Sequence, residues 1–93
     1  MSGITKILVV DDDQDIIEIL RYNLTIAGYN VKTAANGREA IKKAKLFSPE
    51  IILLDVMMPE MNGIEACSAI KSIPSLKETR IIFLSARNED FTQ

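Results

Sequence analysis

The sequence has no histidine and only one cysteine, Cys67. Structural and catalytic zinc sites are built mainly from histidine and cysteine, so this chain has no ligand set for one. A lone cysteine cannot form a disulfide within the chain. Cys67 also lies among apolar residues at helical spacing, where a small core residue is the ordinary interpretation. Zinc binding and an internal disulfide are therefore both excluded.

The chain also lacks a long apolar run and an excess of positive charge. No apolar stretch approaches the roughly 20 residues that cross a bilayer, and residues 1–6 do not show the order of a signal peptide. We therefore expect a cytoplasmic protein without membrane contact. Eleven basic and 13 acidic residues give a net charge of −2. This balance argues against direct nucleic-acid binding, because such surfaces need a basic excess.

The 93 residues are enough for one domain. Along them, hydrophobic patterns typical of strands alternate with patterns typical of helices. Three apolar runs predict strands buried on both faces. They span 7–10, 51–54 and 81–84. Residues 29–33 alternate in polarity, as an edge strand does. Between the strands, apolar residues recur at helical spacing, with Asn36 and Asn62 as candidate helix caps. Strands alternating with helices predict an α/β fold with a parallel sheet covered on both faces.

Polar side chains follow each of the three buried strands. Asp11 and Asp12 come after the first, Asp55 after the second and Ser85 after the last. One aspartate or serine in such a place is usually a helix cap or turn residue, and Asp13 fits that description. The carboxyl ends of parallel strands, however, share one edge of an open sheet, where ligands bind. We therefore expect the four side chains to converge.

Converging carboxylates need a cation or a proton. Two unit charges about 4 Å apart repel by roughly 4 kcal/mol at an effective dielectric of about 20. Oxygen ligands suit Mg²⁺, which favours one or two carboxylates together with water and phosphate oxygens. A carboxylate is also a nucleophile that can form an aspartyl phosphate, and bound Mg²⁺ neutralises charge in that reaction. The hydroxyl of Ser85 would then donate a hydrogen bond to a phosphate oxygen.

At this point the motifs resemble those of a known family. ILVVDDD at 7–13, LLDVMMP at 53–59 with Gly63, and FLSA at 83–86 together resemble the bacterial response regulator receiver domain. The resemblance covers essentially the whole chain in the right order and spacing. It implies a flavodoxin-like, doubly wound parallel sheet with strand order 2-1-3-4-5.

The resemblance also implies a role for each matching position. Asp55 is similar to the phosphoacceptor, and Ser85 to the switch hydroxyl that moves toward the phosphoryl group. Asp12 and Asp11 are similar to the acidic pair that holds Mg²⁺, Asp12 directly and Asp11 through water. The backbone carbonyl of Met57 would be a further ligand. The phosphodonor would be a sensor histidine kinase, a phosphotransfer protein or a small acyl phosphate.

The chain departs from the family pattern at its end. Receiver domains have a fifth strand and a fifth helix, and their active-site lysine follows the fifth strand, whereas here every lysine precedes Ser85 and the sequence stops at Gln93. The resemblance therefore implies a truncated receiver domain over residues 1–93. We expect weaker phosphorylation, retained Mg²⁺ binding, and self-association through the apolar edge strand 81–84.

Two other interpretations stay open. Asp11 and Asp13 fit the D-x-D nucleophile motif of phosphohydrolases of the haloacid dehalogenase type, but that interpretation leaves Asp55 and Ser85 unexplained. The other alternative is a receiver fragment that is deficient in phosphorylation and acts as an assembly or interaction module. In both receiver interpretations the chain is a signalling domain of a two-component system and not an enzyme with a turnover substrate.

Overall fold

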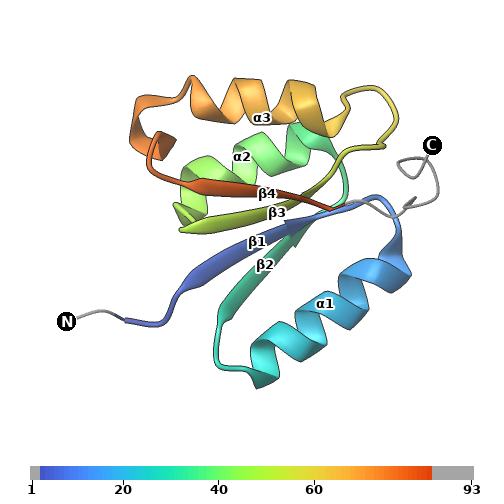
Figure 1. The fold of residues 1–93 in the computed structure, drawn as a ribbon, viewed down its shortest axis with the longest axis vertical. Coiled ribbons are helices and arrows are strands. Elements are labelled where there is room, and N and C mark those ends of the chain that lie inside the picture. Colours follow the sequence, from blue (N-terminus) through green and yellow to red (C-terminus); the bar gives the residue numbers. More distant parts are fainter. Residues whose placement is uncertain (1–2, 85–93) are drawn as a thin grey trace, which may run out of the picture.

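The computed structural model describes residues 3–84, which form a parallel sheet with helices on both faces (Figure 1). In chain order the elements are β1 (Lys6–Val10), α1 (Gln14–Ile26), β2 (Asn30–Ala34), α2 (Gly37–Phe47), β3 (Ile51–Asp55), α3 (Gly63–Lys71), the short 3₁₀ helix η1 (Pro74–Leu76) and β4 (Arg80–Leu84). The strand order is β2-β1-β3-β4, and every pair is parallel. The expected α/β doubly wound fold is confirmed, with its first four strands in the order 2-1-3-4.

Alternate residues of the central strands build two separate cores. Leu8 and Val10 of β1 are fully buried under α2 and α3, together with residues of β3. Ile7 and Val9 point to the opposite face, where Ile17 of α1 packs on them. Figure 1 shows the same division, with α1 on one side of the sheet and α2 and α3 on the other. Each fully buried side chain of this size contributes about 1.5–3 kcal/mol, so both strand faces hold the sheet together.

The helices begin where side chains cap them. Asp13 accepts hydrogen bonds from the N–H groups of Asp15 and Ile16 at the start of α1. Asn36 and Asn62 do the same for α2 and α3, as the sequence predicted. These caps satisfy N–H groups that have no partner within the helix. None of the helices within residues 3–84 is long and apolar enough to cross a membrane.

The two edges of the sheet differ. At the β2 edge, the Lys43 ammonium group donates a hydrogen bond to the Thr33 carbonyl oxygen at 2.6 Å. β4 forms the other edge of the described sheet, and Ile82 and Phe83 on it are 44% and 40% exposed. The edge character predicted for residues 29–33 is thus correct, and the strand predicted at 81–84 forms the opposite edge.

Candidate functional site

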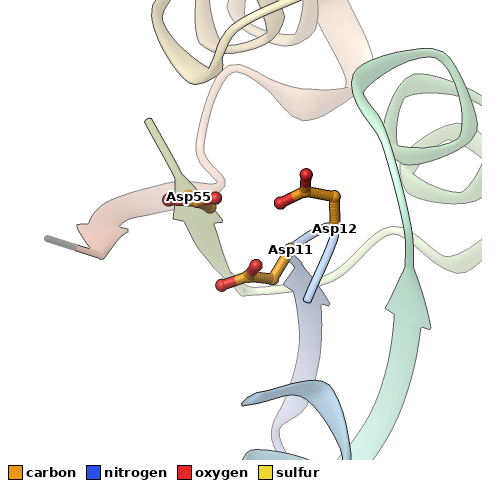
Figure 2. Close-up of side chains that lie close together, drawn as sticks. All are labelled: Asp11, Asp12 and Asp55. Carbon is orange, nitrogen blue, oxygen red and sulfur yellow. The ribbon is translucent and has the colours of Figure 1, made fainter. Parts of the chain in front are cut away.

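Three aspartate side chains meet at the carboxyl ends of the two central strands. Asp11 and Asp12 directly follow β1, and Asp55 is the last residue of β3. β1 and β3 are neighbours, with Val10 beside Leu54, so Asp55 comes beside Asp11 and Asp12 although 43 or more positions separate it from them in sequence. One oxygen of each lies within 4.8 Å of one oxygen of each of the others. Figure 2 shows the three side chains at these strand ends. Ser85, the fourth residue expected here, lies outside the described residues.

The three carboxylates differ in their surroundings. Asp11 and Asp55 are buried, with 6% and 8% of their surfaces exposed, whereas Asp12 is exposed. The N–H of Asp13 donates to Asp11 Oδ1 at 2.9 Å, and the N–H of Met57 donates to Asp55 Oδ1 at 3.3 Å. These backbone hydrogen bonds replace only a small part of the hydrogen bonds to water that each carboxylate loses on burial.

Burial therefore governs the proton affinity of the two inner aspartates. It raises the pKa of Asp11, and the charges of Asp55, Asp12 and Asp13 add to the rise, while the hydrogen bond from the Asp13 N–H opposes it. Burial likewise raises the pKa of Asp55; the bond from the Met57 N–H opposes this, and the charge of Asp12 adds to it. Buried charge without a partner charge is costly, so this cluster favours a bound cation or proton.

The donor set fits Mg²⁺. All three ligand candidates are hard carboxylate oxygens, they converge from two rigid strand ends, and the exposed side of Asp12 leaves room for water. Mg²⁺ keeps several waters and uses few protein oxygens, which matches two or three carboxylates around an open position. Met57, the predicted carbonyl ligand, stands two residues after Asp55, and its side chain is 69% exposed. Its N–H already contacts the Asp55 carboxylate.

The loop from β3 to α3, residues 56–62, is closed tightly at its base. The N–H of Gly63 donates to the Val56 carbonyl oxygen at 2.9 Å. A methyl group on Gly63 would overlap the Asp55 carbonyl oxygen and lie 2.9 Å from the Cα of Val56. Only glycine therefore fits at this point, for steric reasons. The first turn of α3 is thereby fixed against the backbone of the site.

The start of α3 is held by a reciprocal pair of hydrogen bonds. The Asn62 side chain accepts from the Glu65 N–H at 2.9 Å, and the Glu65 side chain accepts from the Asn62 N–H at 3.0 Å. This capping box fixes the direction in which the chain leaves the loop. A pocket lined by Asn62, Val56, Met57 and Met58 lies on the same loop.

Sequence reasoning missed how this loop is anchored. It singled out Pro59 and Gly63 only as members of a motif, but the structure shows Met58 in the main core with 8% exposure and Met61 packed against that core. No sequence pattern shows that methionines in a polar loop point inward, because a loop has no regular period. The contact between Met61 and Gly37 at the start of α2 was equally unreadable.

The comparisons with known proteins agree with this geometry. The chain matches the family model described as "Response regulator receiver domain" over residues 7–93. It is 45% identical over 86 residues to the alkaline phosphatase synthesis transcriptional regulatory protein PhoP of Bacillus subtilis, and 38% identical over 85 residues to the phosphate regulon transcriptional regulatory protein PhoB of Rhizobium meliloti. The alignments cover 92% and 91% of this chain but 35% and 37% of those proteins. The chain thus spans about a third of their length.

Solved structures show the same fold. The chemotaxis protein CheY4 of Vibrio cholerae has a TM-score of 0.85 and 36% identity, with 95% of this chain and 77% of that chain covered. The CheX-CheY-BeF3-Mg+2 complex from Borrelia burgdorferi has a TM-score of 0.82 and 38% identity, with 90% and 64% covered.

Proposed function

This chain belongs to the response regulator receiver family, and on that premise we propose that Asp55 accepts a phosphoryl group with Mg²⁺ held beside it. One observation carries the proposal: Asp55 is a buried carboxylate at a strand end, within 4.8 Å of the carboxylates of Asp11 and Asp12. The phosphodonor we propose is the phosphohistidine of a sensor histidine kinase or phosphotransfer protein. The chain is then the receiving half of a two-component pair.

In the proposed reaction the Asp55 carboxylate is the nucleophile. One of its oxygens forms a bond to phosphorus, the phosphorus–nitrogen bond of the donor breaks, and the electron pair stays on the donor imidazole. Burial matters here in two ways. It removes water that would solvate the carboxylate, and the hydrogen bond from the Met57 N–H holds one carboxylate oxygen in a fixed direction. Proton uptake by Asp55 would stop the reaction, so charge compensation at the site is needed.

The metal we propose is bound by Asp12 directly, by Asp11 through water, by Asp55 and by the Met57 carbonyl. Mg²⁺ at this position would neutralise the charge on the carboxylates and on the incoming phosphoryl oxygens. The Borrelia burgdorferi complex contains BeF3 and Mg together with CheX and CheY. The matched chain of that complex is 38% identical to this chain and shares its fold, and this likeness supports the proposal. Ser85 would contribute a hydrogen bond to a phosphoryl oxygen.

The test is intact mass after incubation with acetyl phosphate and Mg²⁺. We expect the wild-type chain to gain one phosphoryl group and Asp55→Asn to gain none. Glu78→Gln, an exposed carboxylate far along the chain from the cluster, serves as the matched control and should label like wild type. Omission of Mg²⁺ should abolish the gain. Labelling of Asp55→Asn at the wild-type level, or no labelling of wild type at any donor concentration, would contradict the proposal.

A second function, as an assembly module, is favoured by the β4 edge. Within residues 3–84, β4 pairs only with β3, and its apolar side chains Ile82 and Phe83 are partly exposed. An edge strand of this kind is a template for another strand. We propose that copies of the chain associate through it. Light scattering over a range of concentrations should show a larger species for wild type and less of it for Phe83→Lys. An equal monomer content in wild type and Phe83→Lys would contradict association through β4.

A further inference from the structure

The side chain of Met61 lies across the first residue of α2. A methyl group built on Gly37 would lie 2.7 Å from Met61 Sδ, 2.9 Å from its Cγ and 3.0 Å from its Cβ. These separations are well inside van der Waals contact for three successive atoms of one side chain. Gly37 is itself buried. The start of α2 therefore has a notch, with no Cβ in it, that Met61 fills.

The chain direction around Met61 suits this contact. Glu60 has φ = 68°, in the left-handed region that a side chain disfavours. The N–H of Met61 donates to the Pro59 carbonyl oxygen at 2.7 Å, which closes a three-residue turn around Glu60. A residue other than glycine keeps such a conformation only where the surroundings determine it. Here the surroundings are the notch at Gly37 and the core that Met61 packs against.

The same loop carries the site. Met57 follows Asp55 by two residues, donates its N–H to the Asp55 carboxylate, and is followed by the buried Met58. The loop is thus held at Gly63, at Met58 and at Met61, and Met57 lies in the stretch between Asp55 and these anchors. Movement of Met61 would leave only Met58 and Gly63 to hold the loop beyond Met57.

We propose that Gly37 and Met61 are positioning residues that hold the loop 56–62, and through it the Met57 backbone, in the geometry that binds the cation. Part of this inference rests on the proposed function, because the cation is part of that function. The pair touches neither the metal nor the phosphoryl group and acts through the loop. It also links the start of α2, the helix that follows β2, to the loop beside the phosphoacceptor.

Three variants test the pair: Gly37→Ala, Met61→Ala and the double variant. Alanine at the start of a helix is ordinarily favourable compared with glycine, so a change without a clash should stabilise the protein. We expect Gly37→Ala to destabilise the protein instead. It should also weaken Mg²⁺ binding about tenfold, which is the size typical when the support of a metal ligand is lost. In the double variant the contacts with Sδ and Cγ are gone and only the 3.0 Å contact with the Cβ at position 61 remains, so this variant should bind Mg²⁺ within about twofold of Met61→Ala alone. Gly3→Ala, with no atom within 4 Å of its methyl group, is the matched control.

The measurement is an NMR titration with Mg²⁺ that follows the amide signals of residues 56–62. It gives the affinity and, in the metal-free protein, the displacement and exchange rate of the loop amides. Gly37→Ala with wild-type affinity and unmoved loop signals would overturn the inference, as would a double variant whose loss of affinity is the product of the two single losses, because independent sites add in free energy. Failure of the proposed function looks different, because the wild-type chain itself would then not bind Mg²⁺. The loop signals of the metal-free variants would still test the contact.

Discussion

The three carboxylates of the site should destabilise the metal-free fold, and Asp55→Asn tests this directly. The pKa of Asp55 in the folded chain is raised, mainly by burial, from its ordinary value of 3.8. A raised folded-state pKa means that the folded chain binds this proton more tightly than the unfolded chain does. The resulting penalty is absent below the unfolded pKa, grows as the pH rises from the unfolded to the folded pKa, and is complete above the folded pKa. Asparagine has the same shape, can accept the Met57 N–H bond, and carries no charge.

The magnitude follows from the geometry. At 4.8 Å, two unit charges repel by about 3.5 kcal/mol at an effective dielectric of about 20 and by about 0.9 kcal/mol in water. Asp55 has two such neighbours, of which Asp12 is exposed and hence well screened. We expect Asp55→Asn to raise the free energy of unfolding by about 2 kcal/mol at pH 7 in low salt. For a domain of this size that raises the urea midpoint by about 1–2 M.

The assay is urea unfolding without divalent ions, at pH 7 and again at a pH of about 3.5, below the ordinary carboxylate pKa. The gain should be present at pH 7 and shrink toward zero at the lower pH. Mg²⁺ should raise the stability of wild type at pH 7 and reduce the difference, because the proposed ion would bind only the folded cluster. Glu78→Gln should change little at either pH. A gain that is independent of pH, or a loss at pH 7, would refute the electrostatic reasoning.

Three individual contacts give further predictions. Gly63→Ala would force a methyl group onto the Asp55 carbonyl oxygen; we expect a loss of about 2–4 kcal/mol in urea unfolding, with phosphorylation also reduced, and an unchanged midpoint would contradict this. Lys43→Ala frees the Thr33 carbonyl at the β2 edge, so light scattering should detect more self-association than for Lys42→Ala. Asn62→Ala removes the side chain that accepts the hydrogen bond from the Glu65 N–H in the capping box, and the free energy of unfolding should fall by about 1 kcal/mol.

The fold was largely predictable because three of the four strands in the described sheet contain continuous apolar runs and the fourth alternates in polarity. The run at residues 7–10 is apolar at every position, and the structure explains why: Leu8 and Ile7 face different cores. The caps at Asn36 and Asn62 were readable because only a few residue types accept bonds from free helix N–H groups. Strand ends differed by a residue, as at β2, where pairing with β1 decides the boundary.

The site was only partly predictable. That Asp11, Asp12 and Asp55 would share one edge follows from parallel strands, but their burial and mutual distance depend on the register of β1 and β3, which sequence does not show. The loop was harder still. A residue in the left-handed region, such as Glu60, and the contact of Met61 with Gly37 arise from tertiary packing that overrides local preference. Ser85 stays a prediction, since it lies outside the described residues.

The strand order explains why the acidic cluster forms between β1 and β3. From β1 the chain runs through α1 to β2 on one side, and then crosses through α2 to β3 on the other side of β1. The connections after β1 and β3 therefore leave toward opposite faces of the sheet, α1 to one and α3 to the other (Figure 1). This divergence keeps backbone from covering the two strand ends. Charged side chains placed there lie close enough to share the proposed cation and open enough to reach the proposed phosphodonor.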